Sequence, residues 1–539
     1  MKALKAIMAS VGIERWPHTS TTAATTDWRD IYPKLTTELG ITPIFELTIG
    51  QDAKNVSFFT LILDQMAFYT IGRNELMNGS LPENRPIADA YKNFIQGAVM
   101  IMSDDSCDKR ESLRIAEEIF KFEAELATMV VPEEKRRDHT SMYHKLTISQ
   151  LQTELPQVAW LEFFSRIFTT SAIGVPVSSQ DTVVIQEIGY YKAALAYLAK
   201  QERHLIYNYL GLQVLLTLGP VDLDKFGQLK LKLDNATSGI TKRPERWKRC
   251  LGDLNSLADH AVGRMYTDNY FPRQAKNEML HLVKVLADTF KAMLKANVWM
   301  DEQTRAAAIR KVTKISPKIG YPDWATDNAQ LEKLYRYVSA FKKGTPYITI
   351  YANLLKNYAL GLLSKVHDRY NKSYEWVTSA AVVNAFYDQA TNEIVFPAGI
   401  LQKPFYERGL PLAANMGAIG MVIGHEVTHG FDDEGSQYDE EGTLRDWWNK
   451  QAKQTFRGKA QCFVEQYDKT GDEQSGRYLN GVNTQGENIA DNGGLRAAYK
   501  ALQNAKEDSQ YKDMYIPGWP NLDSDQLFFI SNAMMWCTK

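Results

Sequence analysis

The sequence predicts a protein that is mostly α with a small α+β part, arranged as two lobes. Its 539 residues exceed what one hydrophobic core usually organises, and 44% of them are apolar, so two cores are expected. Apolar residues recur at helical spacing through most of the first part of the chain. Beyond Tyr347 the pattern changes to β-rich runs that alternate with helical segments. We therefore expect a mostly helical lobe over 1–345 and an α+β lobe over 346–539.

Several segments of the first lobe have apolar residues at intervals of three and four, which is typical of helices packed on one face. We expect helices over Ser112–Met129, Gln186–Leu210, Lys276–Ala296 and Glu302–Ile315. The charged run Glu133–Asp138 lies between two of them and is typical of a solvated linker.

The overall charge and the first residues exclude some classes of protein. The 62 basic and 64 acidic side chains give a net charge of −2, without the basic stripe expected of a nucleic-acid-binding protein. Lys5 interrupts the first apolar run, so we expect an amphipathic helix there and not a signal peptide. No stretch approaches the roughly 20 apolar residues that span a bilayer. The sequence thus predicts no nucleic-acid partner and no membrane segment in this chain.

The second lobe begins with a predicted hairpin. The runs Ala381–Tyr387 and Glu393–Pro397 are β-rich and flank a short turn at Asp388–Asn392. A glycine-rich helix is expected over Asn415–Gly430, and a further helix over Glu487–Gln503.

The glycine-rich helix carries the pattern HEVTH at residues 425–429. Residues four apart share a helix face, so His425 and His429 can present two nitrogens to one metal ion. Glu426 lies beside that face, where it can take a proton from metal-bound water without ligating. A chance match to the pattern HExxH is expected in about one per cent of chains of this size. The competing interpretation is therefore a surface helix that carries two ordinary histidines. The apolar run Ala418–Ile423 indicates a buried helix, whose polar groups need a partner such as a metal.

A zinc ion in a catalytic site needs a third protein ligand and an open fourth position. No histidine follows His429, so Glu487 is the best candidate. Asp491 lies one turn later on the same face and can accept the other ring N–H of a histidine ligand, and Asp432 is a similar candidate. The competing interpretation is that Glu487 and Asp491 belong to an exposed acidic face.

Together these motifs resemble the neprilysin/endothelin-converting-enzyme family of zinc endopeptidases. The resemblance rests on HEVTHGFDDEG, GENIADNGG and VVNAFYDQATNEIVFPAGILQKPFY, and on Arg246–Phe271 and Trp299–Trp324. It implies a thermolysin-like zincin catalytic lobe and a large helical lobe covering the cleft. It also implies small peptide substrates, one zinc ion per chain, and an extracellular location, as a secreted glycoprotein or as the ectodomain of a plasma-membrane protein.

The same resemblance implies roles for individual residues. Glu426 would be the general base, and Asp491 and Asp432 would orient the histidines, with Asp491 counted among the catalytic residues. Zinc would be bound by His425, His429 and Glu487.

For the substrate, the resemblance implies a backbone-binding pair and an apolar pocket. Asn384 and Ala385 match the pair that hydrogen-bonds the peptide backbone, in agreement with a β-edge at this point. Five further positions match the pocket for the residue after the cleaved bond, although core packing would also explain them. They are Ile400, Phe405, Met421, Val422 and Trp536.

The cysteines are too scattered for a metal or redox motif. By resemblance, three of them are half-cystines of a longer protein and free thiols wherever the partner is missing, while Cys107 matches no family position. The three are Cys250, Cys462 and Cys537. Sequons for N-glycosylation give mild support for secretion, and lie at Asn55, Asn78, Asn235 and Asn371.

The chain departs from the family at both ends, so we expect a piece truncated at its N- and C-termini. It stops at Lys539, without the histidine and arginine with which the family stabilises the transition state. Loss of one such donor costs about 10²–10³ in rate in other hydrolases. The main hypothesis is a zinc endopeptidase that cuts before bulky apolar residues. The alternatives are a zinc-loaded, weakly active or inactive fragment that binds peptides, and a helical scaffold with a coincidental motif.

Overall fold

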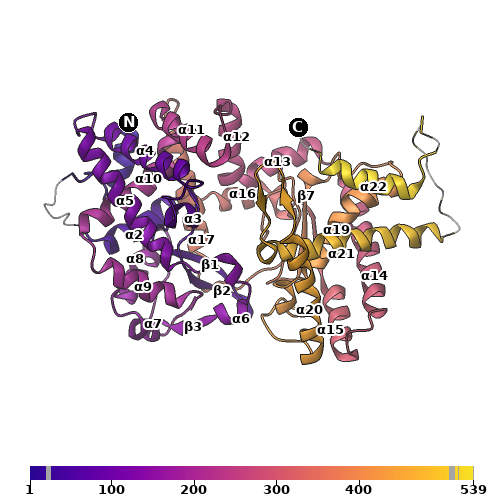
Figure 1. Cartoon of the computed structure of the whole chain (residues 1–539). Coiled ribbons are helices and arrows are strands. Elements are labelled where there is room, and N and C mark those ends of the chain that lie inside the picture. Colours follow the sequence, from indigo (N-terminus) through magenta and orange to yellow (C-terminus); the bar gives the residue numbers. More distant parts are fainter. Residues whose placement is uncertain (20–25, 509–510, 512–515, 517, 520, 538–539) are drawn as a thin grey trace.

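The computed structural model describes residues 1–19, 26–508, 511, 516, 518–519 and 521–537. Figure 1 shows two lobes side by side, with the indigo and purple N-terminal segments in one and the orange and yellow C-terminal segments in the other. Helices dominate both lobes and the strands are few. The expected fold class is confirmed.

The N-terminal lobe surrounds one large apolar core, in which Tyr32, Phe45 and Trp160 are fully buried. The helix predicted over Ser112–Met129 begins earlier than expected, at Lys109, because the Asp108 carboxylate accepts hydrogen bonds from the N–H groups of Arg110 and Glu111. The helices of this lobe are α1 (Lys2–Ser10), α2 (Trp28–Leu39), α3 (Arg73–Met77), α4 (Arg85–Met102), α5 (Lys109–Met129), α6 (His139–Met142), α7 (Ile148–Glu154), α8 (Trp160–Phe168), α9 (Ile188–Leu198), α10 (Arg203–Asp222), α11 (Asp224–Ser238) and α17 (Tyr347–Leu363).

A four-stranded sheet lies in the same lobe and was not predicted. Its strand order is β1-β2-β4-β3, with β2 antiparallel to β1 and parallel to β4. The strands are β1 (Glu46–Asp52), β2 (Asn55–Asp64), β3 (His144–Thr147) and β4 (Thr182–Ile185). At the β1–β2 turn, the carbonyl of Ala53 accepts a 2.7 Å hydrogen bond from the N–H of Leu444 in the other lobe. The sheet therefore forms part of the contact between the lobes.

The predicted helix over Gln186–Leu210 is two helices, α9 and α10. The polar run Lys200–Glu202 interrupts the apolar positions that both helices bury, and the chain turns there. Helical spacing on each side of this run was read correctly, whereas the break between the two helices was missed.

The C-terminal lobe has its own core, which includes the buried side chains of Ile394, Phe396, Ile423 and Phe528. Its helices are α14 (Arg273–Lys295), α15 (Glu302–Lys314), α18 (Leu412–Asn415), α19 (Met421–His429), α20 (Lys450–Tyr467), α21 (Gly481–Lys506) and α22 (Ser524–Met535). A single π-helical turn at Met416–Gly420 joins α18 to α19. The predicted glycine-rich helix thus consists of three joined pieces.

A three-stranded sheet in this lobe contains the predicted hairpin. The strand order is β5-β7-β6, so β6 is an edge strand, antiparallel to β7. The strands are β5 (Ser316–Gly320), β6 (Phe386–Asp388) and β7 (Glu393–Pro397), and a small separate hairpin pairs β8 (Gly471–Asp472) with β9 (Arg477–Tyr478). The first arm of the hairpin is shorter than predicted, because the residues before Phe386 do not pair with β7.

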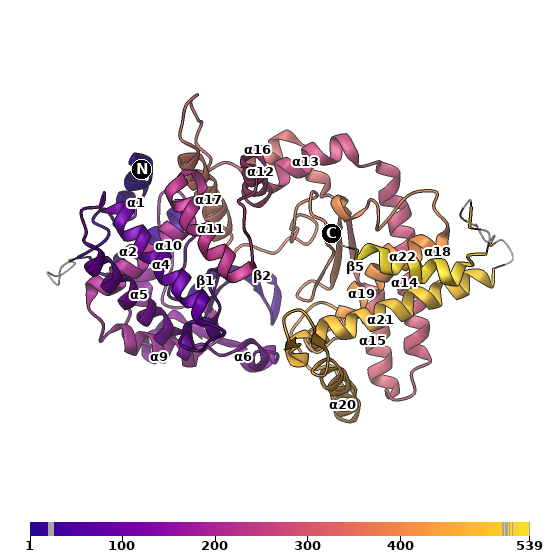
Figure 2. The ribbon, with the colours of Figure 1, turned by 45° about the horizontal axis from the view of Figure 1, so that its top comes forward.

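The two cores interleave along the chain. Helix α17 places Ile348 and Leu363 in the N-terminal core, although it follows residue 345. Helix α14 places Met279 and Leu286 in the C-terminal core, although it precedes that residue. The chain therefore passes between the lobes more than once, and Figure 2 shows the crossing segments, α12 (Arg246–Leu257), α13 (Asp259–Tyr270) and α16 (Asn328–Leu334).

Within the described residues, no helix combines the length and the apolar character needed to cross a bilayer. All four cysteines are free thiols. The four asparagines of the sequons are exposed.

Candidate metal centre

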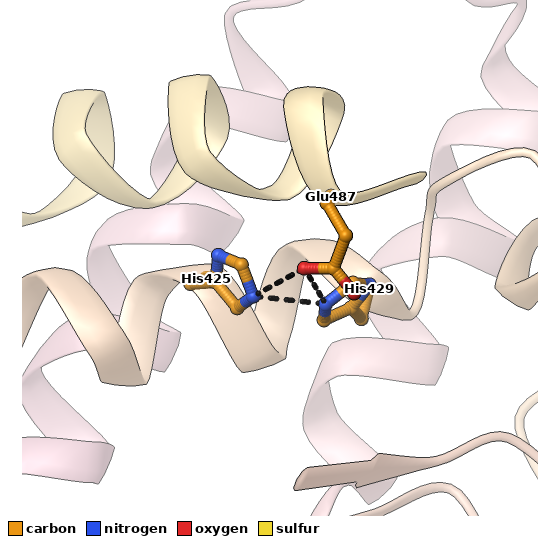
Figure 3. A group of neighbouring side chains, drawn as sticks. All are labelled: His425, His429 and Glu487. Atoms are coloured by element: carbon orange, nitrogen blue, oxygen red, sulfur yellow. Dashed lines mark hydrogen bonds and ion pairs between the residues drawn. The ribbon is translucent and has the colours of Figure 1, made fainter. Parts of the chain in front are cut away.

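Helices α19 and α21 cross at glycines, which lets their backbones approach closely. A Cβ on Gly494 would lie 2.5 Å from the backbone nitrogen of His425, and one on Gly424 would lie 2.7 Å from the carbonyl oxygen of Gly494. Glycine at both positions is therefore a condition of the crossing. Figure 3 shows α21 running alongside α19, with Glu487 pointing toward the two histidines.

His425, His429 and Glu487 converge on one point (Figure 3). The two Nε2 atoms are 2.9 Å apart, and Glu487 Oε2 lies 3.3 Å from His425 Nε2 and 3.5 Å from His429 Nε2. Ligand atoms around a tetrahedral zinc ion, with bonds of about 2.0–2.2 Å, are about 3.3–3.6 Å apart. Both carboxylate–imidazole distances match this range, and the two Nε2 atoms are closer together than it. In the part of the chain that the structure describes, no other trio of His, Cys, Asp or Glu side chains has such spacing.

Both histidine rings are oriented by carboxylates on their far side. His425 Nδ1 is 2.9 Å from Asp491 Oδ1, and His429 Nδ1 is 2.7 Å from Asp432 Oδ2. Because an ionised carboxylate only accepts, each Nδ1 carries the hydrogen of its hydrogen bond. In the neutral rings both Nε2 lone pairs then face each other and the Glu487 oxygen. Three acceptors meeting at hydrogen-bond distance repel each other unless a cation lies among them, and this donor set fits zinc.

The electrostatics of the site also favour a positive charge. Burial lowers the pKa of His425, but hydrogen bonds to Asp491 and Glu487 outweigh it and raise that pKa to about 9. The same balance, with Asp432 and Glu487 as partners, raises the pKa of His429 to about 10. The hydrogen bonds to His425 and His429 hold the pKa of Glu487 well below its ordinary value. In the absence of a metal, protons supply the charge that the carboxylates attract.

Glu426 lies on α19 between the two histidines in sequence and is 4% exposed. Burial raises its pKa to about 7, and the two histidines offset part of that rise. A carboxylate with this pKa can accept a proton and give it back near neutral pH.

The metal centre opens into a cavity of about 400 Å³ that both lobes line. Asn384 and Ala385 lie in its wall directly before β6, followed by Phe386 and Tyr387 of β6 itself. The Ala385 N–H donates to Asn384 Oδ1, at 2.9 Å. A second cavity of about 610 Å³ shares Phe386 and Tyr387 and continues between the lobes. An unpaired edge strand beside a metal centre is a suitable surface for an extended peptide.

The five residues matched to an apolar pocket lie elsewhere. Ile400 and Met421 are buried in the C-terminal core, and Phe405 and Val422 pack against it. Trp536, at the end of α22, is 64% exposed. Among the residues that the structure describes, none of these five lines the metal-centre cavity. Their role in substrate specificity stays a prediction.

Sequence reasoning missed a buried lysine that holds the loop after α19. Lys311 Nζ donates to the carbonyls of Gly435 and Tyr438, at 2.7 and 2.6 Å. The Asn392 amide donates to the carbonyl of Lys311 and accepts from Tyr387 Oη of the edge strand. The signal was present, because Lys311 occupies an apolar-stripe position of α15, with Ala307, Ala308 and Val312.

Comparison with known proteins decides the family. Two models of peptidase family M13 match the chain, one over residues 1–322 and the other over 384–539. The chain belongs to peptidase family M13. The second match contains all three converging side chains and Glu426. Membership of this family supports the prediction that the protein is a metalloendopeptidase. The zinc dependence of M13 enzymes agrees with the donor set of two histidines and one glutamate.

Relatives of this M13 chain include named peptidases. It is 34% identical to "Neprilysin-1" of Trittame loki, over 100% of the chain and 74% of that protein. It is 32% identical to "Endothelin-converting enzyme 1" of Rattus norvegicus and covers 65% of it. It is 33% identical to human "Membrane metallo-endopeptidase-like 1" and covers 63% of it. The chain thus spans less than two thirds of the length of the last two.

Solved structures share the fold. The inhibitor complex of the Mycobacterium tuberculosis zinc metalloprotease ZMP1 has a TM-score of 0.84 at 25% identity, covering 100% of this chain and 77% of that one. PEPO from Lactobacillus rhamnosis has a TM-score of 0.79 at 23% identity, covering 98% and 77%. Both fit the expected combination of a thermolysin-like lobe and a helical lobe.

Proposed function

We propose that this M13 chain is a zinc-dependent endopeptidase that hydrolyses short peptides, with zinc on His425, His429 and Glu487 and with Glu426 as the general base. One observation carries the proposal: three acceptor atoms converge beside a buried glutamate and an unpaired edge strand. A zinc ion bound there would polarise the scissile carbonyl and bring the pKa of water toward about 7.

The protein's own groups then move one proton. Glu426 accepts it as the water oxygen attacks the carbonyl carbon, and returns it to the amide nitrogen as the C–N bond breaks. The products are a carboxylic acid and an amine, and transfer of the acid proton to the amine makes them a carboxylate and an ammonium group near neutral pH. Asp491 and Asp432 keep the two imidazoles oriented, with Nδ1 protonated and Nε2 directed at the metal position.

The position of the edge strand supports an extended peptide as substrate. Strand β6 is at the edge of its sheet, and Asn384 and Ala385 directly before it line the cavity, where backbone hydrogen bonds to an extended peptide would form. Arg137 of the N-terminal lobe lines this cavity, and the neighbouring cavity of about 610 Å³ is lined by both lobes, so access between the lobes favours short peptides over folded proteins. Preference for a bulky apolar residue after the cleaved bond rests on the family resemblance of Ile400, Phe405 and Met421, together with Val422 and Trp536.

An extracellular location belongs to the same proposal. It is supported by the family resemblance and by the exposure of all four sequon asparagines in the structure. Glycosylation of these asparagines in a secretory host would be the direct evidence for it.

The test compares the protein with its Glu426→Gln variant, using zinc analysis and an internally quenched peptide that contains a bulky apolar residue. The proposal expects one zinc per chain in both proteins, and a rate at least about 10²–10⁴ lower in the variant. Exposed Glu465 of α20 offers a matched Glu→Gln control with unchanged turnover. Unchanged cleavage by Glu426→Gln would remove Glu426 from its role. Zinc binding without cleavage by the unmodified chain would favour the peptide-binding alternative.

A further inference from the structure

Arg137 belongs to the N-terminal lobe but reaches into the wall of the metal-centre cavity. It lies within the charged run that the sequence indicated as a solvated linker. Its Nε and Nη2 atoms are 2.8 and 3.0 Å from the two carboxylate oxygens of Asp433. Its Nη1 atom is 2.9 Å from Glu434 Oε1. All three guanidinium nitrogens thus contact the loop that follows α19.

The backbone around Arg137 is held by the same loop. Gln437 Nε2 donates to the carbonyl of Arg137 at 2.7 Å, and Gln437 Oε1 accepts from the N–H of His139 at 2.9 Å. His139 Nδ1 also shares a 2.9 Å hydrogen bond with Tyr438 Oη. Figure 2 shows α6, which begins at His139, beside the start of α21. The position of the guanidinium is therefore well defined.

Asp433 and Glu434 are directly linked to the carboxylate that orients His429. Asp432 Oδ2 accepts from His429 Nδ1, and Asp432 Oδ1 accepts from the N–H groups of Glu434 and Gly435, at 2.9 and 2.6 Å. Arg137 therefore holds Asp433 and Glu434, and Glu434 is one of the two residues whose backbone N–H groups bond to Asp432. A shift of these residues would rotate the ring that presents Nε2 to the metal.

The same guanidinium packs against the residue before the third ligand. A Cβ on Gly486 would lie 3.2 Å from Arg137 Nη2, 3.1 Å from Asp432 Oδ2 and 3.3 Å from Asp433 Oδ1. Glycine at this position leaves room for the ion pair directly beside Glu487. One side chain from the opposite lobe thus adjoins both segments that deliver metal ligands.

We propose that Arg137 is a positioning residue, supplied by the N-terminal lobe, that fixes the metal-binding geometry of the C-terminal lobe through Asp432, Asp433 and Gly486. As a contributor to catalysis it rests on the proposed peptidase activity, whereas its effect on metal binding rests only on the metal centre. The planar guanidinium matches both oxygens of Asp433 while reaching Glu434, which a lysine ammonium cannot do.

Arg136 provides a matched control for the loss of one buried arginine in this segment. Its guanidinium pairs with Asp64 and Glu187 of its own lobe, and its side chain is 12% exposed, against 24% for Arg137. Arg136→Gln and Arg137→Gln remove the same charge from adjacent positions. Only the second removes a contact with the loop after α19.

The experiment measures zinc affinity by competition with a chromogenic chelator and the visible spectrum of the cobalt-substituted protein, for both variants and for Arg137→Lys. We expect Arg137→Gln to weaken zinc binding about 10–100-fold and to alter the cobalt absorption bands. Arg137→Lys should recover part of the lost zinc affinity. Arg136→Gln should retain the wild-type zinc affinity within about twofold. At saturating zinc, Arg137→Gln should lower kcat more than it changes KM.

Wild-type zinc affinity and an unchanged cobalt spectrum in Arg137→Gln would overturn the proposal, as would an equal loss in Arg136→Gln. If Arg137→Gln fails to fold, Asp433→Asn breaks the same contact from the other lobe and is expected to weaken zinc binding similarly. If the wild-type protein binds zinc but cleaves no peptide, the proposed function fails, while the affinity and the spectrum still decide the role of Arg137.

Discussion

Replacing Gly494 with alanine should force α19 and α21 apart at the metal centre. The added Cβ would lie 2.5 Å from His425 N and 2.8 Å from Met421 O, about 0.9 Å inside ordinary van der Waals contact. Both atoms belong to backbone, so no side-chain rotation relieves the overlap. Gly494 shares a helix face with Glu487, seven residues earlier. A separation of this size would stretch a zinc–oxygen bond of about 2.1 Å toward about 3 Å.

We expect Gly494→Ala to lower the free energy of unfolding by at least about 1–3 kcal/mol and to weaken zinc binding at least about 10–100-fold. Thermal unfolding of the metal-free protein and a zinc competition titration measure the two effects separately. Gly458→Ala is the control, because a Cβ at this position of α20 meets nothing within 4 Å, and alanine there should be neutral or stabilise by up to about 1 kcal/mol. Unchanged melting and zinc affinity in Gly494→Ala would refute the close crossing of the helices.

Three further predictions follow from buried groups and from the metal. Lys311→Met leaves the carbonyls of Gly435 and Tyr438 without their donor, so denaturant unfolding should show a loss of about 1–3 kcal/mol. Exposed Lys314→Met should change little, and equal losses would contradict this account. Burial raises the pKa of Glu123 to about 7. The folded protein therefore keeps a proton that the unfolded chain releases above about pH 4.5. As a result, this group's contribution to stability falls as the pH rises from about 4.5 to 7. Glu123→Gln should therefore gain up to about 3 kcal/mol over the wild type between pH 4.5 and 8, and a constant difference across this range would argue against the shifted pKa. Removing zinc with 1,10-phenanthroline should abolish peptide cleavage and lower the melting temperature until zinc is restored, whereas cleavage by verifiably metal-free protein would contradict the proposal.

Local spacing was enough to predict the part of the metal centre that one helix builds. His425 and His429 are one turn apart on α19, so helix geometry alone places them together, and Asp432 follows three residues after the helix ends. Glu487 could only be a candidate, because its approach depends on the packing of α21 on α19. The glycines at Gly493 and Gly494 were a visible signal of that approach, since a Cβ on either would meet α19.

Features that depend on distant partners were not predictable from local pattern. Strand β5 pairs in parallel with β7, more than seventy residues later, and nothing in Ser316–Gly320 identifies that partner. Arg137 lies in a charged run, which usually indicates solvated chain. Only the apposition of the lobes shows that this side chain faces Asp433 and not water. Helix α17 likewise joins the N-terminal core through contacts that its own sequence does not specify.

The most direct test of the metal centre is anomalous diffraction from crystals of the zinc-loaded protein, recorded on both sides of the zinc absorption edge. The account predicts one peak about 2.0–2.2 Å from His425 Nε2, His429 Nε2 and a Glu487 carboxylate oxygen. A peak at another position, or none among these three side chains, would contradict it.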